Sequence, residues 1–155
     1  KSLISFAKDY EFRYWADTHS SGWKGPIINS KKRLNNGKSI KVNLKSDRSA
    51  SRMVLLLPKE SNLNSFNLGS LEIKTSLSRW GFTKGFYAIY LNGVYDKDVE
   101  LTLNFDTNQE AINGYLMDIS TKLPDHLEEL YKARSGIFSP VHRGDQGILF
   151  KKIKI

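Results

Sequence analysis

The sequence predicts a mainly β fold, an antiparallel β-sandwich of jelly-roll type with one short helix near the C-terminus. Apolar and polar residues alternate along several short segments, which is the pattern of half-buried strands. Turn residues recur about every eight to fifteen positions between residues 35 and 120, a spacing typical of antiparallel sheets. Aromatic residues make up 12% of the 155 positions, and these broad side chains favour strands.

The middle of the chain contains the clearest strand segments. Ser39–Lys45 alternates apolar with polar or charged residues and follows the turn sequence Asn-Asn-Gly at 35–37. Arg52–Leu57 is an almost continuous apolar run that ends at Pro58, so we expect a more central strand there. Further strands are expected at Asn64–Leu68, Leu71–Thr75, Gly85–Asn92, Val99–Phe105 and Ala111–Ile119. Asn92-Gly93 is expected to form a hairpin-type turn.

The C-terminal third is expected to add a helix and a last strand. In Leu123–Arg134 the apolar residues fall at helical spacing, and Gly136 follows as a terminator. Gly147–Ile155 has the composition of a final strand. Its candidate inward residues are Ile148, Phe150, Ile153 and Ile155. Because these four positions change phase, we expect a β-bulge near Lys151-Lys152.

The first thirty residues show no single pattern. Leu3–Trp15 is rich in aromatic residues and is a candidate strand, whereas His19–Pro26 has the composition of a polar loop. Whether residues 1–37 belong to the sandwich or form a linker stays open. The chain starts at Lys1 and lacks a signal-peptide pattern. We therefore interpret residues 1–155 as one domain, excised from the C-terminus of a larger membrane protein.

No catalytic or metal site is expected within this domain. The chain has no cysteine, which excludes disulfides, thiolate nucleophiles and cysteine zinc ligands. His19, His126 and His142 each lack a second ligand at the spacing of a zinc motif. There is also no Gly-x-Ser-x-Gly elbow for a nucleophilic serine and no Gly-rich phosphate loop. These absences predict a non-catalytic domain with no cofactor of its own.

The net charge of +8 is concentrated in the first half of the chain. Residues 1–80 contain 15 Lys and Arg against 6 Asp and Glu, and the remainder contains 9 against 10. This asymmetry suggests an acidic partner, whether nucleic acid, an anionic membrane surface or an acidic neighbouring domain. The candidate basic docking residues are Lys31, Lys32, Arg33, Lys41, Lys45 and Arg48. The alternative is a solvated, lysine-rich strand face that discourages edge-to-edge aggregation.

A second hypothesis gives the chain an independent binding role. Trp15, Trp23 and Trp80 are interleaved with Lys and Arg and offer stacking surfaces for a sugar or single-stranded nucleic acid. The chain would then be a stand-alone binding module for carbohydrate or nucleic acid. Tryptophan in a domain of this size is more often part of the core, so nucleic acid is the weaker expectation.

Several stretches from about residue 38 to the C-terminus occur in the order of one known family. The tail is the most specific: Asp118–Pro124, then Leu127, Leu130 and Ala133-Arg134, then Pro140 and Gly144–Phe150. The upstream matches are Lys41–Met53, Ser65–Gly69, Trp80, Gly85–Tyr90 and Val99–Phe105. Together they resemble the C-terminal domain of membrane-anchored family-28 zinc metallopeptidases, which are exported aminopeptidase-like proteins related to endoplasmic-reticulum and vacuolar membrane peptidases. Lys122 and Ser135 depart from this pattern, where Gly and Pro are usual.

In proteins of that family a zinc peptidase domain and several membrane helices precede such a soluble domain. The resemblance therefore implies a periplasmic or luminal location, with the catalytic domain and membrane helices of the parent chain as partners. It also implies that the zinc ligands and the catalytic Glu lie elsewhere in the parent. No catalytic motif of the family has a counterpart here. The implied role is a non-catalytic accessory domain for positioning, access control or docking.

Overall fold

The computed structural model describes residues 24–79, 81–120 and 147–155, and these form a mainly β structure. The strands are β1 (Ile27–Leu34), β2 (Ser39–Lys45), β3 (Arg52–Pro58), β4 (Leu63–Leu68), β5 (Leu71–Lys74), β6 (Phe86–Asn92), β7 (Val99–Phe105), β8 (Asn113–Ser120) and β9 (Gly147–Lys154). Three single 3-10 turns lie between them: η1 (Asn35–Gly37), η2 (Lys59–Ser61) and η3 (Gly81–Thr83). The predicted helix at Leu123–Arg134 and the candidate strand at Leu3–Trp15 lie outside the described residues.

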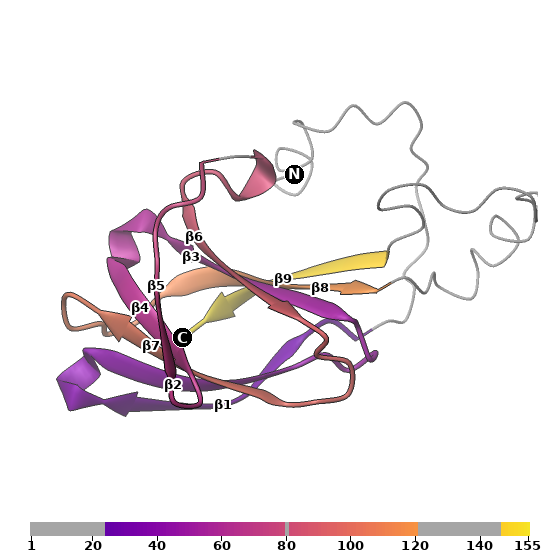
Figure 1. The fold of residues 1–155 in the computed structure, drawn as a ribbon, viewed down its shortest axis with the longest axis horizontal. Helices are drawn as coiled ribbons and strands as arrows, with labels where there is room; N and C mark the ends of the chain where they lie inside the picture. The colour runs from indigo at the N-terminus through magenta and orange to yellow at the C-terminus, as the bar shows by residue number, and fades with distance from the viewer. Residues whose placement is uncertain (1–23, 80, 121–146) are drawn as a thin grey trace, which may run out of the picture.

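The strands form two antiparallel sheets, as the sequence predicts (Figure 1). One sheet has five strands in the order β1-β2-β7-β4-β5, and the other has four in the order β6-β3-β8-β9. Figure 1 shows the four-stranded sheet above the five-stranded one. The expectation that β3 is central is confirmed, because it pairs with β6 on one side and β8 on the other.

One hydrophobic core lies between the facing sides of the two sheets. Its residues come from alternate positions of β2 and from alternate positions of β3. They include Ile40, Val42 and Leu44 of β2 and Met53, Leu55 and Leu57 of β3, each at most 1% exposed. Full burial of such a side chain stabilises the fold by about 1.5–3 kcal/mol. The alternation predicted for Ser39–Lys45 is thus the direct cause of its position against the core.

The turn before β2 depends on a glycine. Asn36 and Gly37 have φ values of 55° and 88°, in the left-handed region, which glycine adopts without steric cost. A Cβ on Gly37 would also lie 3.0 Å from the carbonyl oxygen of Gln109. In the native turn the Gln109 amide donates a hydrogen bond to the Gly37 carbonyl at 3.1 Å. The predicted turn is confirmed, and it connects β1 to β2 while contacting the β7–β8 loop.

The expected hairpin turn at Asn92-Gly93 is wrong. β6 pairs with β3 in the four-stranded sheet, whereas β7 pairs with β2 and β4 in the five-stranded sheet. The chain therefore crosses from one sheet to the other after Asn92. The Gly93 amide donates a hydrogen bond to the carbonyl of Ser51 at 2.8 Å. This contact with the start of β3 replaces the cross-strand bond of a hairpin.

The expected bulge near Lys151-Lys152 is also wrong. β8 and β9 pair without a shift from Asn113 opposite Lys154 to Ser120 opposite Gly147. The apolar residues of β9 do not follow one alternating pattern, because some pack on one side of the sheet and some on the other. Ile153 packs against the main core, whereas Phe150 packs on the opposite side.

β1 is a strand that the sequence patterns did not reveal. It forms the edge of the five-stranded sheet and has five consecutive exposed residues, from Asn29 to Arg33. An edge strand of this kind has little apolar alternation to detect. At least residues 27–34 therefore belong to the sheet and not to a linker.

Candidate docking surfaces

The six basic residues proposed from the sequence do not share one face. Lys31 pairs opposite Val42, and Lys32 pairs opposite Lys41. Directly opposite residues of an antiparallel pair lie on the same face. Lys31 therefore lies on the core-facing side of the sheet, at its edge, and Arg33 lies on the same side. Lys32 lies on the outer side.

Two of the outer lysines are engaged by carboxylates. Lys41 Nζ lies 2.7 Å from Oε1 of Glu100, and Lys45 Nζ lies 4.0 Å from Oδ1 of Asp98. Such exposed pairs contribute only about 0–1 kcal/mol to stability. They nevertheless reduce the positive charge that this face offers to an anionic partner.

Arg48 lies in a buried polar cluster. Its side chain is 10% exposed, and its Nε and Nη2 atoms lie 2.8 and 2.7 Å from Oδ1 of Asp118. Asp118 is fully buried, and its Oδ2 accepts a hydrogen bond of 2.7 Å from the Ser46 hydroxyl. Arg48 Nη2 also donates to the carbonyl oxygens of Asp118 and Gly147, at 3.1 and 2.6 Å. The cluster joins the β2–β3 loop to the end of β8 and the start of β9. Its polar groups therefore stabilise the fold.

A different set of cations lies along the edge strands β1 and β9, with side chains on both sides of each strand. The Lys31 ammonium donates a hydrogen bond to the carbonyl of Lys154 at 3.2 Å, so the edges of the two sheets meet at this point. Each strand contributes three exposed cations. We call this set the basic seam: Lys31, Lys32, Arg33, Lys151, Lys152 and Lys154. None of the ion pairs among the described residues involves them.

The sequence located only the β1 half of the basic seam. The other half was visible as the run Lys151-Lys152-x-Lys154. Sequence spacing could not connect the two runs, because they lie at opposite ends of the chain and meet only through the packing of two sheets.

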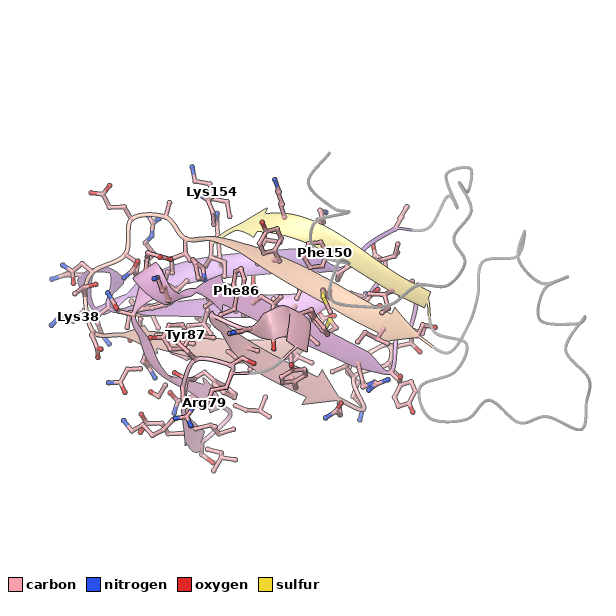
Figure 2. All side chains as sticks on the ribbon, turned by 90° about the horizontal axis from the view of Figure 1, so that it is seen from above. Lys38, Arg79, Phe86, Tyr87, Phe150 and Lys154 are labelled. Carbon is pink, nitrogen blue, oxygen red and sulfur yellow. The ribbon has the colours of Figure 1, made fainter. Side chains whose placement is uncertain are left out.

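The outer side of the four-stranded sheet is apolar, like its inner side. We call it the outer apolar face: its centre consists of Val54, Leu56 and Met117, and Phe86, Tyr115 and Phe150 surround that centre. The Tyr115 ring stacks on Phe150 with centroids 4.8 Å apart. It meets Phe86 edge-on at 6.0 Å. Figure 2 looks onto this side, with Phe86 and Phe150 labelled.

The outer side of the five-stranded sheet is polar by contrast. Ser39, Asn104, Ser65 and Glu72 form a hydrogen-bonded row across four strands. The Ser65 hydroxyl donates to Glu72 Oε1 at 2.6 Å. This hydrogen bond, together with the positive charge of Lys74, lowers the pKa of Glu72 below its ordinary value. These polar groups bind one another across the sheet.

An open pocket of ≈ 440 Å³ lies beside η3. It is lined by Ser76, Leu77, Ser78, Arg79, Lys84 and Gly85. The Ser78 hydroxyl is hydrogen-bonded to the Thr83 hydroxyl at 2.6 Å. Among the described residues that line it there is neither a carboxylate nor a histidine.

Several residues singled out from the sequence lie outside the described residues: Trp15, Trp23, Trp80, His19, His126 and His142. Across residues 24–79, 81–120 and 147–155, no three His, Asp or Glu side chains are grouped so that they could hold a metal ion.

No helix in the part of the chain that the structure describes has the length and apolarity needed to cross a membrane.

Comparisons of the chain with protein-family models, with curated proteins and with solved structures found no match.

Proposed function

We propose that this chain is a non-catalytic accessory domain that docks on an anionic membrane surface through the basic seam. Its fold would be a β-sandwich of jelly-roll type. Six exposed cations without carboxylate partners among the described residues are the observation that carries this proposal. A cation close to an anionic bilayer contributes about 1 kcal/mol to binding. The seam therefore offers enough binding free energy for reversible attachment.

The parent protein is proposed to be a membrane-bound zinc metallopeptidase of the aminopeptidase type. This part of the proposal rests on the resemblance of residues 38–155, which also suggests a periplasmic or luminal location. A domain held beside its own membrane helices would need little intrinsic affinity, because tethering raises its effective concentration at the bilayer. The reading frame upstream of Lys1 tests this point: it should encode a zinc-ligand set followed by apolar helices.

A charge-matched pair of variants tests membrane docking. The seam variant replaces four cations with glutamine: Lys32, Arg33, Lys151 and Lys152. The control variant replaces four exposed cations elsewhere: Lys59, Lys74, Lys84 and Lys97. We expect the unmodified chain to co-sediment with vesicles that contain phosphatidylserine and to lose binding as salt increases. The seam variant should bind about a hundredfold or more weakly, since about 1 kcal/mol is lost per cation.

The control variant should retain most of the binding because its net charge equals that of the seam variant while its seam is intact. Equal losses in both variants would show that only net charge matters and would contradict the proposal. If vesicle binding does not depend on anionic lipid, the proposal is wrong. The lysines would then only protect the edge strands from pairing with other chains. Binding to single-stranded nucleic acid but not to vesicles would favour the stand-alone binding module.

A further inference from the structure

β5 is an edge of the five-stranded sheet. It pairs with β4 on one side, and no described strand pairs with it on the other. Leu71, Glu72 and Lys74 are exposed, and Leu71, at 61%, is the most exposed large apolar side chain among the described residues. The peptide groups of such an edge are a template for pairing with another chain unless the edge is protected.

The other three edge strands of the described sheets, β1, β6 and β9, are protected. β1 and β9 carry the cations of the basic seam, which would repel the same strand of a second copy. β6 pairs with β3 on one side, and on its other side Tyr87 forms a bridge with Leu77. β5 has one acidic and one basic residue, Glu72 and Lys74, so no repulsion between like charges protects it.

The hydrogen bonds of the β4–β5 hairpin define which peptide groups of β5 point outward. The Thr75 amide donates to the carbonyl of Asn64, on the β4 side, at 3.0 Å. In an antiparallel ladder, alternate residues direct their N–H and C=O groups to opposite sides of the strand. Thr75 and Ile73 therefore direct theirs toward β4, whereas Glu72 and Lys74 direct theirs outward.

We propose that two copies of this chain pair through β5 about a two-fold axis at Ile73. The two five-stranded sheets then join into one continuous antiparallel sheet. Glu72 of each copy lies opposite Lys74 of the other, and these residues exchange both of their outward backbone hydrogen bonds. Ile73 lies opposite its own counterpart, on the side of the sheet that faces the core.

Charge selects this register over its neighbours. Only residues with outward peptide groups bond across the axis, so the axis lies at Glu72, at Ile73 or at Lys74. An axis at Glu72 would place two glutamates opposite each other, and an axis at Lys74 would place two lysines there. The axis at Ile73 gives two pairs of opposite charge, which stabilise a cross-strand contact. The described contacts of the Glu72 side chain, with the Ser65 hydroxyl and with Lys74, use only Oε1, which leaves Oε2 for the second copy.

The pairing is expected to be weak. β5 has four residues, so two such strands bury less area than a standard protein–protein interface. The dimer should therefore form as the chain concentration rises. Sedimentation velocity of the full chain over a range of concentrations measures its dissociation constant.

Complementary charge reversals test the pairing in the full chain. Glu72→Lys puts a lysine opposite Lys74, and Lys74→Glu puts a glutamate opposite Glu72. Each variant alone should dimerise about tenfold or more weakly than the unmodified chain, because both cross-strand pairs become repulsive. In an equimolar mixture the lysines of one variant face the glutamates of the other, so dimers should form again. The control Glu110→Lys has the same net charge as Glu72→Lys and lies outside β5, so it should dimerise like the unmodified chain.

Single cysteines test the register. The chain has no cysteine, so an introduced thiol reacts without background. In Ile73→Cys the two thiols meet at the axis, where the Cα atoms of a non-hydrogen-bonded pair lie about 4.5 Å apart, within the range of a disulfide. In the control Leu71→Cys the position is more exposed, but the two thiols are offset by about 13 Å along the strands. We expect Ile73→Cys to form the disulfide between chains about tenfold faster.

A chain that stays monomeric at every concentration would overturn the inference. So would charge variants that dimerise like the unmodified chain, a mixture that does not associate, or equal disulfide formation at the two positions. Binding of β5 to a strand of another protein, without self-association, would also contradict it. If a melting curve shows that a charge variant does not fold, the cysteine variants decide. The substitutions leave the basic seam intact, and β1 lies at the opposite edge of the sheet from β5, so dimerisation and membrane docking can fail separately.

Discussion

The Arg48 guanidinium and the Asp118 carboxylate form an ion pair that is largely withdrawn from water. Asp118 is 0% exposed and the Arg48 side chain 10% exposed. Removing one partner of a buried pair leaves the other charge without compensation, which is far more costly than losing an exposed pair. The Ser46 hydroxyl and two backbone carbonyls add further hydrogen bonds to the pair.

Replacement of this carboxylate should therefore strongly destabilise the fold. We expect Asp118→Ala to lower the free energy of unfolding by about 3–5 kcal/mol. The matched control Asp98→Ala removes a carboxylate from an exposed pair with Lys45 and should cost less than about 1 kcal/mol. Urea denaturation of the two variants compares these losses. A loss at Asp118 as small as that at Asp98 would show that Arg48 relaxes into water.

At the scale of the elements, the approach of β8 to β3 depends on a glycine. A Cβ on Gly114 would lie 2.6 Å from the carbonyl oxygen of Leu56 and 3.0 Å from Cδ2 of Leu57. Backbone atoms of a central strand cannot move away without disturbing the sheet. The β3–β8 pairing from Arg52 to Leu56 therefore requires a residue without a side chain at this position.

We expect Gly114→Ala to lower the free energy of unfolding by about 1–3 kcal/mol, the usual cost of overpacking. Gly25→Ala is the matched control, because no atom lies within 4 Å of a Cβ built there. That change should be neutral or slightly stabilising, since alanine restricts the unfolded chain. Thermal unfolding of both variants checks the difference. Equal midpoints would contradict the close approach of β8 to β3.

The strands that could be predicted are those with one buried face. Ser39–Lys45 and Val99–Phe105 alternate clearly and match β2 and β7 residue for residue. β1 was missed because its side chains from Asn29 to Arg33 are exposed, so no alternation reports its strand geometry. The alternation of apolar and polar residues indicates which side chains are buried, and an edge strand buries few side chains.

The outer apolar face had a signal in the sequence that could have been used. The continuous apolar run in Arg52–Leu57 implies a strand buried on both sides, and β3 has buried residues facing both cores. The same fact explains the phase change in β9 that suggested a bulge. The basic seam had no comparable signal, because its two halves meet only when two sheets pack. Pairing partners such as β3 with β6 also cannot be read from local sequence.

For the whole molecule, burial is greatest along β3 and low in β5, an edge strand of the five-stranded sheet. Every residue from Met53 to Leu57 is at most 1% exposed, whereas Leu71 of β5 is 61% exposed. We expect amide hydrogens of β3 to exchange at the rate of global unfolding and those of β5 to exchange through local opening. Hydrogen exchange followed by mass spectrometry compares peptides covering the two strands. Equal protection would contradict a separate opening of the hairpin.

The end of β8 lies beside the start of β9, although 26 residues separate these two points in the sequence. Ser120 pairs directly with Gly147, and Arg48 binds the carbonyls of Asp118 and Gly147 on either side of that junction. The residues between positions 120 and 147 thus leave and re-enter the sheet at neighbouring points, held by a third segment. Closing a longer loop between fixed ends costs only about 0.6 kcal/mol for each doubling. The pairing of Ser120 with Gly147 should therefore tolerate a change in the number of residues that connect these two positions.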